Sequence, residues 1–216
     1  ALTLAGNSIS LGANVNAGTT LTLTTGAISQ AGGVLTAPVL TGSATGPVTL
    51  LGASNAIGSL GPFSAAGQTV RVATGGNMSL AGAVSAGTLD LRVTGTLTQS
   101  AGAPIAAALL TGSAATATLG ASNNIASLGP FTAGTGFQLT NAATTVSGNV
   151  TVGTGTLSLT SSTLAAGGGL LRAPRIELQV DRVTTTGAII DGATGLVAVA
   201  PRTAGTAIAV GDALPA

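Results

Sequence analysis

The sequence predicts an all-β fold, a parallel β-helix (β-solenoid) with about 20 residues per coil. Three observations lead to this prediction. Short apolar pairs recur at a nearly constant step, the segments around them alternate apolar residues with Thr, Ser or Asn, and Gly-rich turns separate the segments. Repeats of this kind are typical of architectures in which short units stack along one axis and share a core.

The period comes from pairs of apolar residues separated by one residue. In sequence positions, the steps between successive pairs are 19, 27, 22, 19, 28, 20, 20, 19 and 20, and the pairs begin at Leu2, Leu21, Val48, Val70, Leu89, Ala117, Phe137, Leu157, Ile176 and Leu196. We expect Leu21, Val48 and Val70 to lie on adjacent rungs of one core of small aliphatic side chains. Roughly eleven coils at about 4.8 Å each predict a rod on the order of 50 Å long.

A thirteen-residue segment occurs twice with only two differences. LGASNAIGSLGPF occupies Leu51–Phe63, and LGASNNIASLGPF occupies Leu119–Phe131, 68 positions later. The repetition predicts 68-residue units of three coils at 21-88 and 89-156, followed by a divergent unit at 157-216. Because the sequence starts and stops within the pattern, we expect all of it, residues 1-216, to be a single solenoid segment of a longer chain.

The segments between the turns are predicted to be short strands. TLTLTTG, TVRVATG and TLDLRVTG alternate apolar and polar residues and are rich in Thr and Val, which suits half-buried pleated strands. The Gly and Asn residues between them favour turns because they tolerate positive φ. An immunoglobulin-like sandwich fits the sequence less well, because its core usually needs large side chains and aromatic residues are only 1% here.

The composition argues against several classes of protein. With 45% hydrophobic residues the chain is too apolar for disorder, and without Cys it has no disulfide framework. Its longest apolar run, Ala103–Leu110, is too short for a membrane span. Only 5% of residues are charged, the net charge is +1 and Lys is absent, so we expect neither a nucleic-acid partner nor a phosphate-binding loop.

Several segments carry a resemblance to a known family. LTGSATG, LGASNAIGSLGPFSAAG, GTLDLRVTGTLTQSAG, RAPRIEL and GLVAVAPRTAGTAIAVG resemble the repeat region of filamentous-haemagglutinin-like exoproteins of the bacterial two-partner secretion systems. The resemblance implies a right-handed parallel β-helix that an outer-membrane transporter exports, and a secreted fibre at the bacterial cell surface that acts as an adhesin for a host or surface receptor. No counterpart of the family's secretion domain and no family binding-site motif is found in these residues.

The charged residues give one candidate for an active site. Eight of the eleven lie from Arg172 onward, and RAPRIELQVDR is the only cluster. Arg175, Glu177 and Asp181 are expected to share a strand face, which leaves open a polysaccharide-active enzyme of the β-helix class. The chain has no His, Lys, Cys or Tyr to serve as acid, base or nucleophile. We therefore expect a non-enzymatic protein in which these charges solvate one outer face, form a salt-bridged edge or favour one register between coils.

Metal, cofactor and ice binding find little support in the pattern. The glycines of GGGLLRAP are followed by no Asp, unlike the nonapeptide of calcium-binding β-solenoids, so we expect no metal and no cofactor. TTLTLTTG, at Thr19–Gly26, has the alternation of an ice-binding face. Because Thr-x-Thr does not recur in the corresponding strands TVRVATG and TLDLRVTG, a regular ice-matching surface is not predicted.

Four residues recur at equivalent places and are expected to have structural roles. Asn55 and Asn123 would either occupy left-handed turns or donate and accept amide hydrogen bonds with neighbouring loops. Phe63 and Phe131, each after Gly-Pro, would fill a corner of the tube. The Asn-x-Ser/Thr sequences at Asn77 and Asn149 do not recur at equivalent places, so glycosylation there is not predicted.

The function that these observations favour is structural and adhesive. We expect a β-helical stalk, coated with Thr, Ser and Asn, that belongs to a secreted bacterial surface fibre. Open strand edges at the two ends and a nearly neutral surface favour a homo-oligomer or a fibre, formed by end-to-end or lateral association. The polysaccharide-active enzyme and the ice-binding solenoid are the alternatives.

Overall fold

The computed structural model describes residues 1–184, 187, 189–191 and 195–207. This part of the chain contains strands, turns and bends and no helix. The strands form one continuous sheet in which each strand lies parallel to its neighbours. The prediction of an all-β solenoid with coils of about 20 residues is confirmed, and the stack has about 10 turns.

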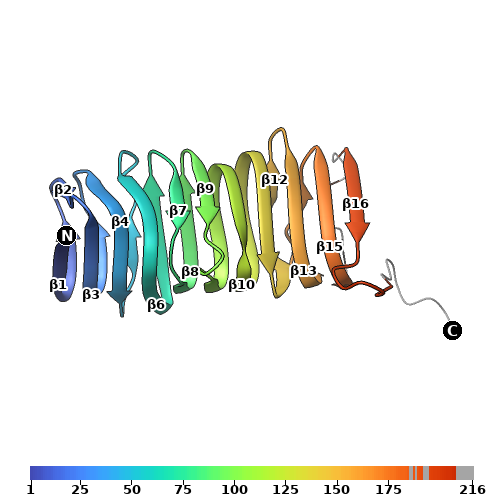
Figure 1. Ribbon diagram of the computed structural model, residues 1–216, viewed down its shortest axis with the longest axis horizontal. Coiled ribbons are helices and arrows are strands. Elements are labelled where there is room, and N and C mark those ends of the chain that lie inside the picture. Colours follow the sequence, from blue (N-terminus) through green and yellow to red (C-terminus); the bar gives the residue numbers. More distant parts are fainter. Residues whose placement is uncertain (185–186, 188, 192–194, 208–216) are drawn as a thin grey trace.

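Sixteen strands make up the described sheet. In chain order they are β1 (Leu2–Leu11), β2 (Val15–Asn16), β3 (Thr20–Gln30), β4 (Leu35–Ala44), β5 (Val48–Leu50), β6 (Ala56–Thr74), β7 (Met78–Leu80), β8 (Val84–Val93), β9 (Thr96–Gln99), β10 (Ile105–Asn141), β11 (Ala143–Val146), β12 (Val150–Val152), β13 (Thr156–Ala166), β14 (Leu171–Arg172), β15 (Arg175–Thr184) and β16 (Leu196–Ala200). Figure 1 shows them stacked along one axis, with β1 at one end and β16 at the other.

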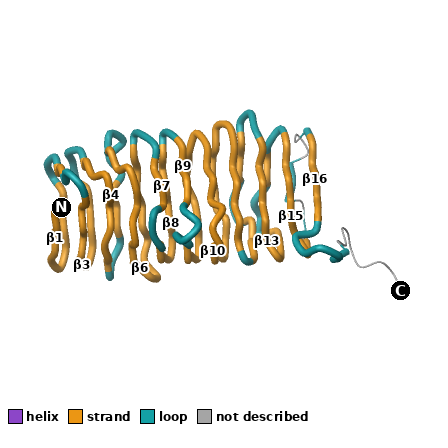
Figure 2. Tube along the Cα trace, in the orientation of Figure 1, coloured by secondary structure: helices purple, strands orange, loops and turns teal. Residues whose placement is uncertain are grey.

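Each strand pairs with the segment one coil later. The offset in sequence position between paired residues ranges from 18, as for Ser127 and Thr145, to 22, as for Val48 and Val70. The strand β10 is longer than a whole coil, so the chain turns corners there without losing its pairing. Figure 2 shows most of the tube as strand, with loops along its upper edge and further loops beside β8 and β9.

The core consists of columns of aliphatic side chains, one residue per coil. Val48 pairs with Val70, so these two side chains are stacked on adjacent rungs as expected, and Ile28 pairs with Val48 on the preceding rung. Leu21 is not in this column, because its partner in the next coil is Leu40. Val48 lies on the rung after β3, which contains Leu21, so the three predicted residues lie on adjacent rungs of one core, with Leu21 in a separate column. All five side chains are at most 1% exposed, so both columns belong to one dry interior.

The 68-residue repeat is not a whole number of coils. Leu23, Gly42 and Phe63 are successive partners. Val84 follows Phe63 on the next rung, three coils after Leu23. The residue 68 positions after Leu23 is Leu91, which lies seven residues beyond Val84 and in a separate column. The repeat therefore covers three coils and about one third of a fourth, and not the three whole coils that the spacing predicts.

Two glycines of the repeat are required by close contact between coils. The sequence LTGS occurs at residues 40–43 and 110–113, and its glycines, Gly42 and Gly112, have φ angles of +144° and +150°. A Cβ atom at Gly42 would overlap the carbonyl oxygen of Leu23, and one at Gly112 would overlap that of Leu91. Only glycine fits where one coil approaches the next so closely with this backbone conformation.

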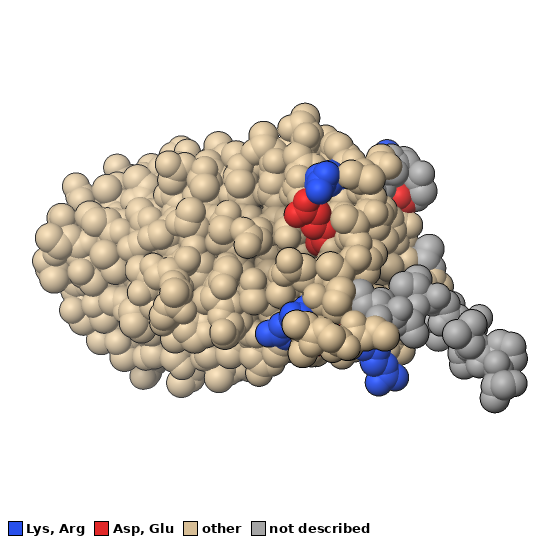
Figure 3. Space-filling model, turned by 45° about the vertical axis from the view of Figure 1, so that its right-hand side comes forward, with Lys and Arg blue, Asp and Glu red and all other residues tan. Residues whose placement is uncertain are grey.

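The outer surface is almost free of charge. Figure 3 shows one face in which the half nearer the N-terminal coils bears no charged side chain, while the few charges gather toward the other half. Among the described residues the exposed large hydrophobic side chains are Leu196, Val197 and Val199, all in β16. Val197 and Val199 continue the columns of Ile176 and Leu178, and β15 covers only one edge of β16.

Candidate functional site

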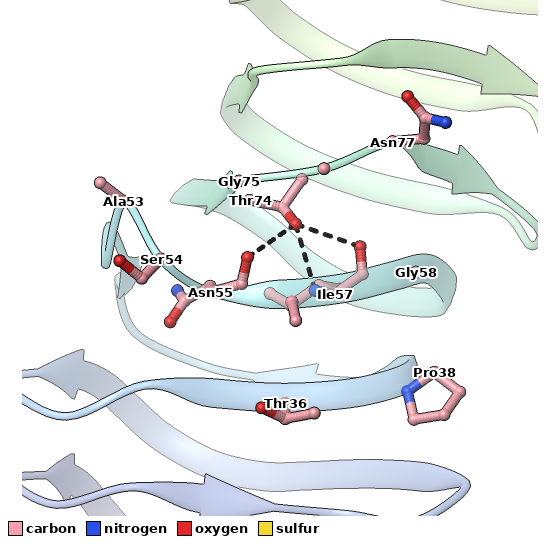
Figure 4. Close-up of a pocket in the computed structure, with 12 residues that line it drawn as sticks. Thr36, Pro38, Ala53, Ser54, Asn55, Ile57, Gly58, Thr74, Gly75 and Asn77 are labelled. Atoms are coloured by element: carbon pink, nitrogen blue, oxygen red, sulfur yellow. Dashed lines mark hydrogen bonds between the residues drawn. The ribbon is translucent and has the colours of Figure 1, made fainter.

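A shallow groove of about 730 Å³ follows the first copy of the thirteen-residue segment. It is lined by residues 53–58, by residues 74–77 of the next coil, and by Thr36 and Pro38 of the preceding coil (Figure 4). Asn55, one of the predicted positions, lies in this lining, and its residue is only 1% exposed. The lining of the groove therefore includes an amide residue that is almost completely buried.

Asn55 forms a reciprocal amide pair with Gln30. Gln30 Nε2 donates to Asn55 Oδ1 at 2.9 Å, and Asn55 Nδ2 donates to Gln30 Oε1 at 2.9 Å. The same two oxygens accept backbone N–H groups, Asn55 Oδ1 from Leu35 at 2.9 Å and Gln30 Oε1 from Gly52 at 3.0 Å. Two side chains thus satisfy backbone donors that would otherwise be buried without partners.

The second copy repeats this arrangement with Gln99 and Asn123. Gln99 Nε2 donates to Asn123 Oδ1 at 2.7 Å, and Asn123 Nδ2 donates to Gln99 Oε1 at 3.2 Å. Ile105 and Ala121 supply the backbone donors, at 2.9 and 3.0 Å. Of the two roles expected for these Asn residues, the structure has the amide hydrogen bonds. The left-handed turn is wrong, since every described residue with positive φ is glycine.

The coil after each pair continues the buried polar contacts. Thr74 Oγ1 donates to the Asn55 carbonyl at 3.0 Å and accepts from the Ile57 N–H at 3.1 Å, as Figure 4 shows. In the second copy Asn141 Oδ1 accepts from the Ile125 N–H at 2.8 Å. These contacts lie inside the wall of the tube and hold neighbouring coils in register, so their role is structural.

Phe63 and Phe131 are buried, as the corner-filling prediction requires. They are 2% and 1% exposed, and each follows a Gly-Pro pair. Near Phe63 the register between β4 and β6 shifts by one residue: Leu40 pairs with Leu60, whereas Gly42 pairs with Phe63. Phe131 also contacts Phe137, with ring centroids 4.8 Å apart and planes tilted by 56°.

The predicted charged face is present but does not form a convergent site. Arg175 Nε pairs with Glu177 Oε1 at 2.6 Å, and both side chains are at least 40% exposed. Asp181 instead accepts from Thr203, from its N–H at 2.7 Å and from its hydroxyl at 2.8 Å. The backbone hydrogen bond from Thr203 lowers the pKa of Asp181 below its ordinary value. The carboxylates are thus separately engaged.

A second charged cluster joins residues that are far apart in the sequence. Arg71 in β6 pairs in register with Asp90 in β8, and Arg92 lies two residues beyond Asp90 on the same side of the strand. Arg92 donates to Asp90 through Nε at 3.1 Å and through Nη2 at 2.9 Å. This hydrogen bond and the attraction of the carboxylate raise the pKa of Arg92. The interval between Arg71 and Asp90 is close to one coil, but only the register of β6 and β8 shows that they are partners.

Asn77 and Asn149 share a role that the 68-residue repeat does not reveal. Both are exposed and directly precede short strands. Asn77 Oδ1 accepts from the Thr96 N–H at 2.8 Å, and Asn149 Oδ1 accepts from the Leu170 N–H at 3.1 Å. Each amide links its turn to the turn of the next coil.

The outward columns do not form a regular threonine lattice. Thr22 pairs with Thr41, but Thr20 pairs with Val39 and Thr24 with Ser43. A face matched to ice needs the same spacing of hydroxyl and methyl groups on every rung, and this face changes within one coil. TVRVATG is not the corresponding strand that the Thr-x-Thr comparison assumes, because the partner of residues 20–25 in the next coil is residues 39–44, and TVRVATG belongs to the column of Val48.

Within the described residues, no three His, Cys, Asp or Glu side chains are grouped so that they could hold a metal ion. The described part of the chain also has no helix that is long and apolar enough to cross a membrane. Comparison of the chain with protein-family models, with curated proteins and with solved structures gives no match.

Proposed function

We propose that this chain is a non-enzymatic, structural and adhesive segment of a secreted bacterial surface fibre. The observation that carries the proposal is the use of about 10 coils for one continuous stack whose outer columns include runs of hydroxyl side chains, such as Thr3, Thr22 and Thr41. Such a stack projects a surface over a distance, and its outer side chains can change without disturbing the core. The resemblance of its repeats to filamentous-haemagglutinin-like exoproteins adds an outer-membrane transporter as the export partner.

The geometry supports a stalk because each coil contacts only its neighbours. In a repeat protein of this kind, stability is a sum of coil and interface terms, so coils can be added without redesigning a global core. Backbone hydrogen bonds join successive coils, and the buried columns consist mostly of aliphatic residues. A chain that extends in this way can serve as a spacer between a cell and a ligand.

Self-association is part of the proposal. Val197 and Val199 are 40% and 42% exposed although they continue core columns, and Leu2 and Leu4 at the other end are partly exposed. A parallel strand from a second copy would cover Val197 and Val199 as β16 itself covers Ile176 and Leu178. Head-to-tail contacts of this kind are heterologous and produce filaments.

The enzyme alternative has less support. Arg175 and Glu177 form an exposed ion pair on β15, and Asp181 is held by Thr203. Catalysis by two carboxylates requires them to face one another across a bound sugar. We therefore propose a binding role and test it against hydrolysis directly.

Electron microscopy and bead adhesion test the proposal. We expect the purified protein to form thin rods that join end to end, and beads coated with it to adhere to cells more than beads coated with albumin. Release of reducing ends from polysaccharides, lost in Glu177→Ala, would show an enzyme instead. Compact particles that do not support adhesion would contradict both the stalk and the adhesive role.

A further inference from the structure

Three charged residues meet on an otherwise neutral surface. Between residues 1 and 171 the only charged side chains are Arg71, Asp90 and Arg92. They lie on two adjacent rungs, with Thr49 before them and Thr111 after them in the same outward column. Since nothing else in this stretch is charged, its electrostatic field comes from this one cluster.

The cluster contains a fixed guanidinium. The Asp90 side chain is 9% exposed, while the Arg92 side chain is 56% exposed. Arg92 is held at Asp90 by its Nε and Nη2 groups, which leaves the remaining N–H groups of the guanidinium directed away from the carboxylate. A two-point ion pair of this kind limits the rotation of the arginine before any ligand arrives.

The cluster also contains an arginine with no partner. Within the described part of the chain, Arg71 is exposed and makes neither an ion pair nor a side-chain hydrogen bond. Asp90 is its register partner, but both Asp90 oxygens accept from Arg92. The fork of N–H donors on Arg71 is therefore available to an oxyanion without breaking an existing contact.

A hollow lies beside the two arginines. It has a volume of about 250 Å³, and its lining combines Arg92 with apolar Leu51 and Ala73 and with the hydroxyl residues Thr94 and Ser113. Ala73 pairs in register with Arg92, and it lies two residues beyond Arg71 on the same side of β6. At about 3.3 Å per residue, the hollow begins roughly 7 Å from the Arg71 backbone. Apolar and hydroxyl groups together suit the two kinds of surface on a sugar ring.

We propose that this surface binds a glycan through one carboxylate-bearing sugar, with the carboxylate on Arg71 and the sugar ring in the hollow beside Arg92. The inference rests on the adhesive role proposed above and names its ligand class. Two arginines and one aspartate give the cluster a charge of +1, which matches a single carboxylate. A dense polyanion would find no further cations here, because affinity for such polymers grows with the number of charges neutralised.

Galacturonan with most carboxyl groups methyl-esterified is the probe, because it carries isolated carboxylates. We expect the protein to bind this polymer and to bind the fully esterified polymer at least about tenfold more weakly, a difference of 1.4 kcal/mol. Arg71→Ala should weaken binding by the same factor, and Arg71→Lys should restore part of it. Arg182→Ala, which removes another exposed arginine, is the matched control and should bind like the wild type.

The results separate this inference from the adhesive role. Equal binding by wild type and Arg71→Ala, or equal binding of the two esterified polymers, overturns the site. A preference for dextran sulfate over the isolated carboxylates also overturns it. If Arg71→Ala loses the glycan but wild-type beads do not adhere to cells, the site stands and the adhesive role fails. If beads coated with either protein adhere alike, the adhesive role stands without this site.

Discussion

The two copies of the thirteen-residue segment share their letters but not their backbone. In the first copy, residues 53–54 form a turn, closed by the Asn55 N–H donating to the Gly52 carbonyl at 3.0 Å. In the second copy, residues 119–123 are part of the continuous strand β10. The reciprocal amide pair is nevertheless present in both. A hydrogen-bonding pair is therefore kept while the local backbone adapts to the coil in which it lies.

The difference comes from the spacing between the amide partners. Asn55 lies 25 residues after Gln30, whereas Asn123 lies 24 residues after Gln99. Because the segment between Gln99 and Asn123 is one residue shorter, the chain reaches Asn123 as a continuous strand, without a turn. The pentapeptide LGASN is identical in the two copies, at residues 51–55 and 119–123. Its backbone conformation is therefore decided by pairing with neighbouring coils and not by its own sequence. The following four pairs of variants test how far the copies are equivalent, from the largest expected effect to the smallest.

The aromatic residues should show the largest effects. Phe63→Ala and Phe131→Ala each leave a cavity in the dry core, and we expect losses of about 3–5 kcal/mol in the free energy of unfolding. Phe131→Ala should lower the free energy of unfolding by about 1 kcal/mol more than Phe63→Ala, because Phe131 also contacts Phe137. Denaturant titration measures both. Equal losses would mean that the aromatic contact adds nothing.

The LTGS glycines should behave alike. Gly42→Ala and Gly112→Ala each place a methyl group against a backbone carbonyl at positive φ, and we expect each to lose about 3 kcal/mol. Thermal and denaturant unfolding compare them. A difference above about 1 kcal/mol would show that the coils at these two places can move apart to different extents.

The two asparagines should contribute unequally to stability, although the segments in which they lie are nearly identical. Asn55→Ala and Asn123→Ala each remove the oxygen that accepts a buried N–H, at an expected cost of about 2 kcal/mol. Asn123 also donates to the Leu119 and Thr140 carbonyls, so its loss should be larger by about 1 kcal/mol. Hydrogen exchange at the Leu35 and Ile105 amides locates the effect. If both amides still exchange slowly in the variants, the Asn side chains do not protect them and this prediction is wrong.

The first glycine of each segment should respond with opposite sign. A Cβ atom at Gly52 would lie 2.5 Å from the Gln30 amide nitrogen, so Gly52→Ala should cost about 1 kcal/mol. Gly120 has no atom within 4 Å of the same position, and Gly120→Ala should be neutral or stabilise by about 0.5 kcal/mol. Two variants that both destabilise would show that the second copy is as crowded as the first.

The sequence predicted the solenoid and its coil length, and it indicated the amide role of Asn55 and Asn123 as one of two alternatives. These predictions follow from the periodicity and the internal repetition of the sequence, which are typical of a fold made of similar layers. It did not reveal that Leu21 and Val48 lie in separate columns, because an apolar pair marks an inward strand without saying which side of the coil it is on. The long step between them consists of one coil to Leu40 and eight further residues to the next side.

The amide partners could have been found in the sequence, but the charged cluster required the register. Gln30 and Gln99 are separated by nearly the same interval as the two thirteen-residue segments, and each lies shortly before Ala-Gly, so a comparison of the repeats extended toward the N-terminus would have paired them. Arg71 and Asp90 come together only because their two strands pair in this register. The offset between paired strands varies from one coil to the next, so such contacts depend on the exact length of the turns.

The extra third of a coil in each repeat gives the rod a chiral arrangement of equivalent loops. Every duplication of the 68-residue unit lengthens the molecule and also rotates its newest copy by roughly one third of a revolution about the long axis. Three consecutive copies, about ten coils, would point in three directions before the first orientation returned. A protein that lengthens by this duplication presents equivalent loops all around its circumference. It can therefore contact a neighbouring molecule in any rotation about its long axis.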